Sequence, residues 1–125
     1  QTDLFATIAK IVGAPLEEGV AEDSVDILPT LLQDEPVRKE MVLHAANGKL
    51  GLRQGDWAYL RTGGNTPEPE WFQEHWQGDP LDAPALLFDL SADLAQKKNL
   101  RDKHRQRVRQ MEQRLAEIEK GQSTR

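Results

Sequence analysis

Three histidines are the side chains best suited to acid–base or metal chemistry, and they are dispersed along the chain. His44, His75 and His104 show no H-x-x-x-H spacing, and none has a carboxylate at the sequence distance that metal ligands usually keep. The sequence contains no cysteine, which excludes a disulfide framework and a thiolate metal site. We therefore expect no metal site built by this chain alone.

The carboxylates and glycines also lack a catalytic pattern. The pairs Glu17-Glu18 and Glu22-Asp23 lie in one acidic stretch, whereas acid–base catalysis needs carboxylates that converge from separate elements. No glycine-rich phosphate loop and no G-x-S-x-G elbow occurs. Solubility explains the acidic stretch better than catalysis does.

The strongest polar signal is a basic segment between residues 97 and 109. Its cations are Lys97, Lys98, Arg101, Lys103, Arg105, Arg107 and Arg109. Positive charge opposes the dipole at a helix N-terminus, so an acidic partner is expected. A solvated face paired with acidic loops of the same protein is favoured over a docking surface for a polyanion such as a sulfated polymer. Nucleic acid is the weakest alternative, because the net charge is -5 and no aromatic residues interleave with the cations.

The elements that must position these groups fit one domain of 125 residues, 1–125. Leu4, Phe5 and Ile8 recur at helical spacing after the capping types Thr2 and Asp3, which predicts a first helix that stops near Gly13. A second short helix is expected over residues 25–32, capped by Asp23 or Ser24 and with Pro29 in its first turn.

The middle of the chain changes to a strand pattern. Strands are predicted at residues 41–43, 50–53 and 57–60, joined by turns at Asn47-Gly48 and Gln54-Gly55-Asp56, and a fourth at 86–90. Between the third and fourth, residues 62–84 form a long loop rich in Pro and Gly that also carries Trp71 and Trp76. A loop of this length is usually functional or poorly ordered.

The last element is a long amphipathic helix. Asn99 is its expected N-cap, with Asp102 returning the bond in a capping box. Val108, Met111, Leu115 and Ile118 form one apolar stripe, which His104 extends. The stripe spans about two heptads, so core packing against the sheet is favoured over a coiled coil. Residues 121–125 are expected to form a tail.

The order of these segments resembles the C-terminal end of sulfatases of the alkaline phosphatase superfamily. The resemblance rests on TDLFATIAKIVGAP (2–15), DSVDILPTLL (23–32), KLGLRQGDWAYL (49–60), LLFDLSADLAQKKNL (86–100) and the charged helix that follows. It implies an α+β subdomain with a four-stranded antiparallel sheet, a long C-terminal helix and short N-terminal helices. The superfamily's nucleophile motif, a Cys or Ser followed by x-P-x-R, does not occur here.

The resemblance also implies what the parent protein does. A sulfatase hydrolyses sulfate esters, often of carbohydrates, with a formylglycine nucleophile and a calcium ion, and all the motif positions for them would precede Gln1. The fragment alone is expected to be inert and to pack against an upstream catalytic domain. Its start at Gln1 suggests a fragment. A periplasmic or secreted parent is consistent with the family, whereas the residues themselves leave the compartment open, and they contain no apolar run of membrane-spanning length.

Within this subdomain, His44 is the one residue that we place in a binding site. It lies at the predicted end of the first strand, where a rim of the sheet can face the substrate cleft, and a histidine suits a sulfate group through charge-assisted hydrogen bonds. Trp71 and Trp76 are weaker candidates for the same role.

Two other functions stay open on the residues alone. One is a stand-alone module that binds an acidic polymer or protein through the basic segment and the tryptophan loop. The other is the end of a related phosphodiesterase or phosphonate hydrolase. For an excised subdomain, we expect an open apolar surface around Phe5, Ile8 and the tryptophans of the long loop, with either self-association of the isolated chain or partial disorder of the loop over 62–84.

Overall fold

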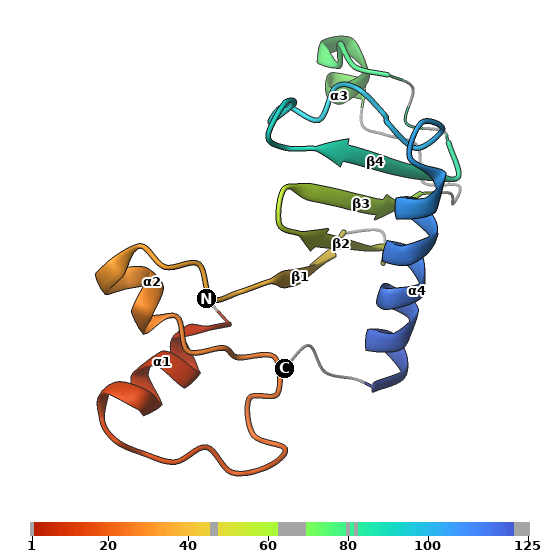
Figure 1. Ribbon diagram of the computed structural model, residues 1–125. Coiled ribbons are helices and arrows are strands. Elements are labelled where there is room, and N and C mark those ends of the chain that lie inside the picture. The colour runs from red at the N-terminus through yellow and green to blue at the C-terminus, as the bar shows by residue number, and fades with distance from the viewer. Residues whose placement is uncertain (1, 46–47, 63–69, 80, 82, 122–125) are drawn as a thin grey trace.

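The structure is a computed structural model that describes residues 2–45, 48–62, 70–79, 81 and 83–121. Figure 1 shows a four-stranded sheet with the long helix α4 across one face, and the helices α1 and α2 together beyond the start of β1. The sheet, the C-terminal helix and the short N-terminal helices confirm the predicted α+β architecture.

All four strands pair in antiparallel fashion and in chain order. They are β1 (Glu40–His44), β2 (Leu50–Gln54), β3 (Trp57–Arg61) and β4 (Ala85–Asp89). The β2–β3 turn places Gly55 at a φ of 55°, which a residue without Cβ adopts at little cost. The predicted turn at Asn47 lies outside the described residues, although Gly48 has a φ of 80° and the hairpin it helps to close is formed. The predicted meander is confirmed.

The main core lies between the sheet and α4 (Arg105–Gly121). Met111, Leu115 and Ile118 of the helix are buried against Leu52 of β2 and Leu87 of β4. Val108 is half-buried beside them, so the predicted stripe is confirmed. The opposite face of the sheet carries a second cluster, in which Ala58, Leu86 and Phe88 are buried under Leu60, Leu81, Ala83 and Leu90. Because β4 is buried on both faces, its sequence is a continuous apolar run.

The last helix begins later than its sequence suggests. Asn99 does not cap α4, because its side-chain oxygen accepts the backbone N–H groups of Leu87 and Arg101, each at 3.1 Å. The predicted capping box with Asp102 is therefore wrong. Residues 100–103 form turns instead, and the N–H of Leu100 donates to the carbonyl of Leu87 at 2.8 Å. Asn99 and Leu100 thus attach the segment before α4 to the outer edge of β4.

The first helix, α1 (Leu4–Ile11), ends as predicted near Gly13, whose φ is 70°. Asp3 occupies the N-cap position but makes no capping bond. Its carboxylate instead accepts the N–H of Val25 at 3.0 Å and pairs with the guanidinium of Arg38. This pairing ties the start of α1 to the segment that leads into β1.

The second helix, α2 (Leu28–Gln33), carries Pro29 in its first turn as predicted, but its N-cap is Ile27. The expected caps are wrong, because the buried hydroxyl of Ser24 accepts the N–H of Ala6 at 2.8 Å. The hydroxyl of Thr7 similarly accepts the N–H of Ile27 at 3.0 Å. The two helices are therefore joined by polar groups.

The long loop over 62–84 contains a helix that its Pro and Gly content hides. This is α3 (Glu70–His75), six residues long. The hydroxyl of Thr62 donates to the carbonyl of Ala83, which closes the base of the loop next to the sheet. The tail prediction for 121–125 is tested only at Gly121, which is the last residue of α4, since 122–125 lie outside the described residues.

Candidate functional site

His44 lies at the exposed end of β1, which is an edge strand of the sheet. In the register of the β1–β2 pair, it faces Leu50. No hydrogen bond or ion pair joins its side chain to another described residue. The side chain is exposed, which a substrate-facing role requires.

The long loop starts and ends at the same end of the sheet as His44. The register pairs Gly51 with Leu60 and Arg61 with Ala85, so the end of β3 and the start of β4 align with the start of β2. Two strand spacings separate β1 from β3, or about 10 Å. The topology therefore brings His44 and the base of the loop to the same end of the sheet, which the sequence did not predict.

Both tryptophan candidates lie in the long loop, on or next to α3. Trp71 is 67% exposed on α3. Trp76 is half-buried, and its indole N–H donates to the carbonyl of Asp79 at 2.9 Å, within its own loop. The third histidine of the chain, His104, lies against the ring of Trp57 with centroids 5.1 Å apart. The three histidines do not converge on one place.

Two clusters of charged side chains that the sequence analysis missed hold α4 on the sheet. In the first, the carboxylate of Glu112 accepts the phenol of Tyr59 and the guanidinium of Arg61, the latter at 2.7 Å. A second carboxylate, that of Glu119, pairs with Arg61 at 2.8 Å. The guanidinium of Arg61 holds the pKa of Glu112 below its ordinary value, while burial and the bond to Glu112 raise the pKa of Tyr59.

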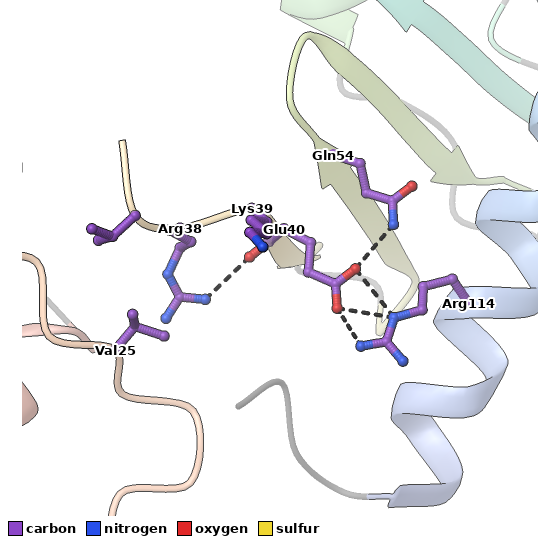
Figure 2. Close-up of a pocket in the computed structure, with 7 residues that line it drawn as sticks. Val25, Arg38, Lys39, Glu40, Gln54 and Arg114 are labelled. Atoms are coloured by element: carbon purple, nitrogen blue, oxygen red, sulfur yellow. Dashed lines mark hydrogen bonds and ion pairs between the residues drawn. The ribbon is translucent and has the colours of Figure 1, made fainter. Parts of the chain in front are cut away.

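The second charged cluster lines a pocket of about 460 Å³ between the start of β1 and α4. Figure 2 shows Gln54 and Arg114 converging on the carboxylate of Glu40, with Arg38 on the segment that leads into β1, near Val25. The hydrogen bond from Arg114 lowers the pKa of Glu40. Both arginines of the pocket are thus paired with acids of this chain, Arg114 with Glu40 and Arg38 with Asp3. We assign the pocket a structural role, since neither guanidinium is left for an anion.

Within the part of the chain that the structure describes, no three His, Cys, Asp or Glu side chains gather as metal ligands would. None of the described helices is long and apolar enough to cross a bilayer.

Comparisons with known proteins agree with this architecture. No known family profile matches the chain. Over 119 residues it is 33% identical to an N-acetylgalactosamine-6-O-sulfatase of Bacteroides thetaiotaomicron, and this match covers 94% of the chain but 23% of that enzyme. The chain therefore spans about a quarter of the length of this curated relative.

Solved structures show the same fold. One, from work on glycosaminoglycan metabolism by Bacteroides thetaiotaomicron, is 28% identical with a TM-score of 0.73, over 93% of this chain and 24% of the other. The Ps i-CgsB structure in complex with k-i-k-neocarrahexaose has a TM-score of 0.64 at 19% identity, over 92% of this chain and 23% of the other, and it supports the fold alone. The chain is thus similar to a sulfatase over nearly its whole length and matches about a quarter of that enzyme, in agreement with the sulfatase resemblance of its sequence.

Proposed function

We propose that this chain is the C-terminal subdomain of a sulfatase that hydrolyses sulfate esters of a sulfated carbohydrate. The observation that carries the proposal is the similarity to an N-acetylgalactosamine-6-O-sulfatase through 94% of the chain. The activity would belong to the longer protein, because the chain spans only 23% of this relative. A sulfated glycosaminoglycan is the proposed substrate class, in line with that enzyme's name and with the glycosaminoglycan metabolism from which the 28% identical structure comes.

The work of the chain itself would be to complete the catalytic domain and to border its substrate cleft. For the first role it offers an apolar face on α1, where Phe5 and Ile8 are each 56% exposed. For the second it offers His44, at the end of the sheet where the long loop also has its base. Under this proposal both features would meet the upstream domain.

Calcium and formylglycine, which the sulfatase resemblance implies, do not fit the residues of this chain. No group of three potential ligands occurs among the described residues, and the sequence has no cysteine and no serine in the x-P-x-R motif. Under this proposal the upstream domain would supply both groups, and this chain would hold neither.

The sulfatase assignment is favoured over a related phosphodiesterase because the curated relative is a sulfatase. The decisive observation is the sequence encoded upstream of Gln1. A C-x-P-S-R or S-x-P-x-R motif is expected there, and its absence would refute the assignment. The longer protein should then release sulfate from 6-sulfated N-acetylgalactosamine, whereas the 125-residue chain alone should give no turnover above a matched blank.

The role of His44 needs a separate test in the longer protein. His44→Ala is expected to raise KM for the sulfated sugar several-fold and to leave the unfolding temperature unchanged, because the side chain is exposed. Met41→Ala is the matched control, since Met41 is an exposed residue of the same strand and lies three positions away. Equal KM values for the two variants would show that His44 does not contact the substrate.

A further inference from the structure

The basic segment, residues 97–109, concentrates positive charge on an otherwise acidic protein. It holds seven Lys and Arg against one acid, Asp102, whereas the rest of the chain has nine Lys and Arg against twenty Asp and Glu. Five of the seven cations are exposed, and Arg101 and Arg107 are half-buried. The segment covers the turns before α4 and the first turns of that helix. The net charge of the segment is therefore positive, whereas that of the whole chain is -5.

The acids of the described chain leave most of these cations unpaired. Asp102 contacts Arg101 at 3.6 Å and Arg105 at 3.9 Å, and both are loose pairs. The remaining five, Lys97, Lys98, Lys103, Arg107 and Arg109, have no ion pair with a described residue.

Two neighbouring carboxylates bind the backbone of the segment rather than its cationic side chains. Asp93 accepts the N–H of Lys98 at 2.7 Å, and Asp79 accepts the N–H of Asn99 at 2.8 Å. Within the described residues, the acidic loops of this chain therefore form no ion pair with these five cations.

Elsewhere in the molecule, three arginines form ion pairs that link distant parts of the fold. Arg38, Arg61 and Arg114 each bind a carboxylate from a distant part of the chain. The basic segment does the reverse, since it gathers like charges at the N-terminal end of α4, where the helix dipole also disfavours them. Contacts within the fold thus account for Arg101, Arg105 and Arg107 at most, whereas binding to a polyanion would account for the whole cluster.

The surface suits a sulfated polymer better than a nucleic acid. Binding of single strands depends on aromatic rings on which bases stack. The ring of Trp57 contacts the segment, but it is half-buried, with Arg107 4.6 Å over it and His104 beside it. A linear polymer with sulfate groups needs only a row of exposed cations, because its contacts are charge–charge contacts and hydrogen bonds to sulfate oxygens.

We propose that the basic segment is a binding surface for a linear sulfated polysaccharide. Arg107 and His104 lie at the start of β3, at the opposite end of the sheet from His44, so the surface is separate from the candidate site. The choice of a sulfated sugar polymer rests on the proposed function, whereas the existence of an anion-binding surface rests on charge alone. The surface would hold the polymer by several weak contacts spread along its length.

Retention of the 125-residue chain on immobilised heparin, as a function of salt, tests the proposal. Binding of a polyanion releases counterions, so affinity falls steeply as salt rises, and each lost contact is expected to reduce the slope of log K against log salt by about 1. The triple variant Lys97→Gln, Lys98→Gln, Lys103→Gln should therefore reduce this slope by about 3 and elute at lower salt than the unchanged chain.

The matched control is Lys10→Gln, Lys39→Gln, Lys120→Gln, which removes three exposed lysines outside the segment and alters net charge equally. This control should elute with the unchanged chain, and far-UV circular dichroism should show both triples folded, since all six side chains are exposed. Failure of the unchanged chain to bind at about 50 mM salt, or equal losses in the two triples, would overturn the proposal.

Two competitors separate the sources of negative charge. Chondroitin sulfate should displace the chain at a lower charge concentration than single-stranded DNA, and the reverse order would assign the surface to nucleic acid instead. The result is independent of catalysis: a missing upstream nucleophile motif would refute the sulfatase function and leave heparin retention unaffected. Conversely, if the chain is not retained on heparin, the proposed binding surface is refuted, while the sulfatase assignment is unaffected.

Discussion

Replacing Leu115 by Ala tests the central packing of the fold. The side chain of Leu115 is 0% exposed and belongs to the cluster that includes Leu52, Leu87 and Met111. Leucine to alanine removes three carbon groups, worth about 2 kcal/mol in transfer free energy. A cavity term adds to this because the neighbours come from three separate elements and cannot all close the gap, so the expected loss is about 3 kcal/mol, within the usual range of about 2–5.

Urea unfolding followed by far-UV circular dichroism measures this loss. With a slope of about 1–3 kcal/mol per M, the Leu115→Ala midpoint should fall by about 1 M or more. Gln113→Ala is the control on the same helix, because Gln113 is exposed and its amide only reaches Glu117 at 3.2 Å. It should lie within about 0.5 kcal/mol of the unchanged chain. Coinciding midpoints for the two variants would show that the stripe of α4 is not the core.

Three further predictions concern the charged pocket, the sheet and the open face of α1. The hydrogen bond from Arg114 lowers the folded-state pKa of Glu40, so the stability that Glu40 adds is present above its unfolded pKa of about 4.5 and is lost as pH falls through the folded-state pKa. Glu40→Gln should therefore flatten the decline of the urea midpoint as pH falls below about 4.5. Gly51→Val should cost about 1–3 kcal/mol in the same assay, since a Cβ there would lie 2.7 Å from the carbonyl oxygen of Tyr59, and an unchanged midpoint would contradict that close contact. Sedimentation of the isolated chain should show concentration-dependent association that Phe5→Ser with Ile8→Ser removes, and a strict monomer at high concentration would exclude self-association through this face.

The regular elements were predictable because their signals are local. Alternation and tight turns marked the strands, and the spacing of Met111, Leu115 and Ile118 marked the buried side of α4. The two capping predictions failed for a common reason. Asn99 and Ser24 are good caps in isolation, but each accepts an N–H from a neighbouring element, and a buried N–H without a partner costs more than a missing cap.

The charged contacts could not be predicted from the sequence, for a different reason. Arg61 and Glu112 are 51 positions apart, and Arg114 and Glu40 are 74 apart, so no local pattern links them. They meet only because α4 crosses the sheet at one particular angle. The same holds for His44, whose place on the end strand was predicted but whose alignment with the base of the long loop follows from strand register.

In the first helix, the side chains that are buried are not the large apolar ones that its sequence pattern predicts. In α1 the small residues Ala6 and Thr7 are the buried ones, held by Ser24 and Asp3, while Leu4, Phe5, Ile8, Ile11 and Val12 are between 47% and 68% exposed. A helix normally buries its large apolar side chains, because each contributes about 1.5–3 kcal/mol when removed from water. Here the polar contacts turn the helix so that this apolar face points outward. Such an arrangement is costly for an isolated domain, and it becomes favourable when further protein covers the face, as the proposed position of this chain within a longer sulfatase requires.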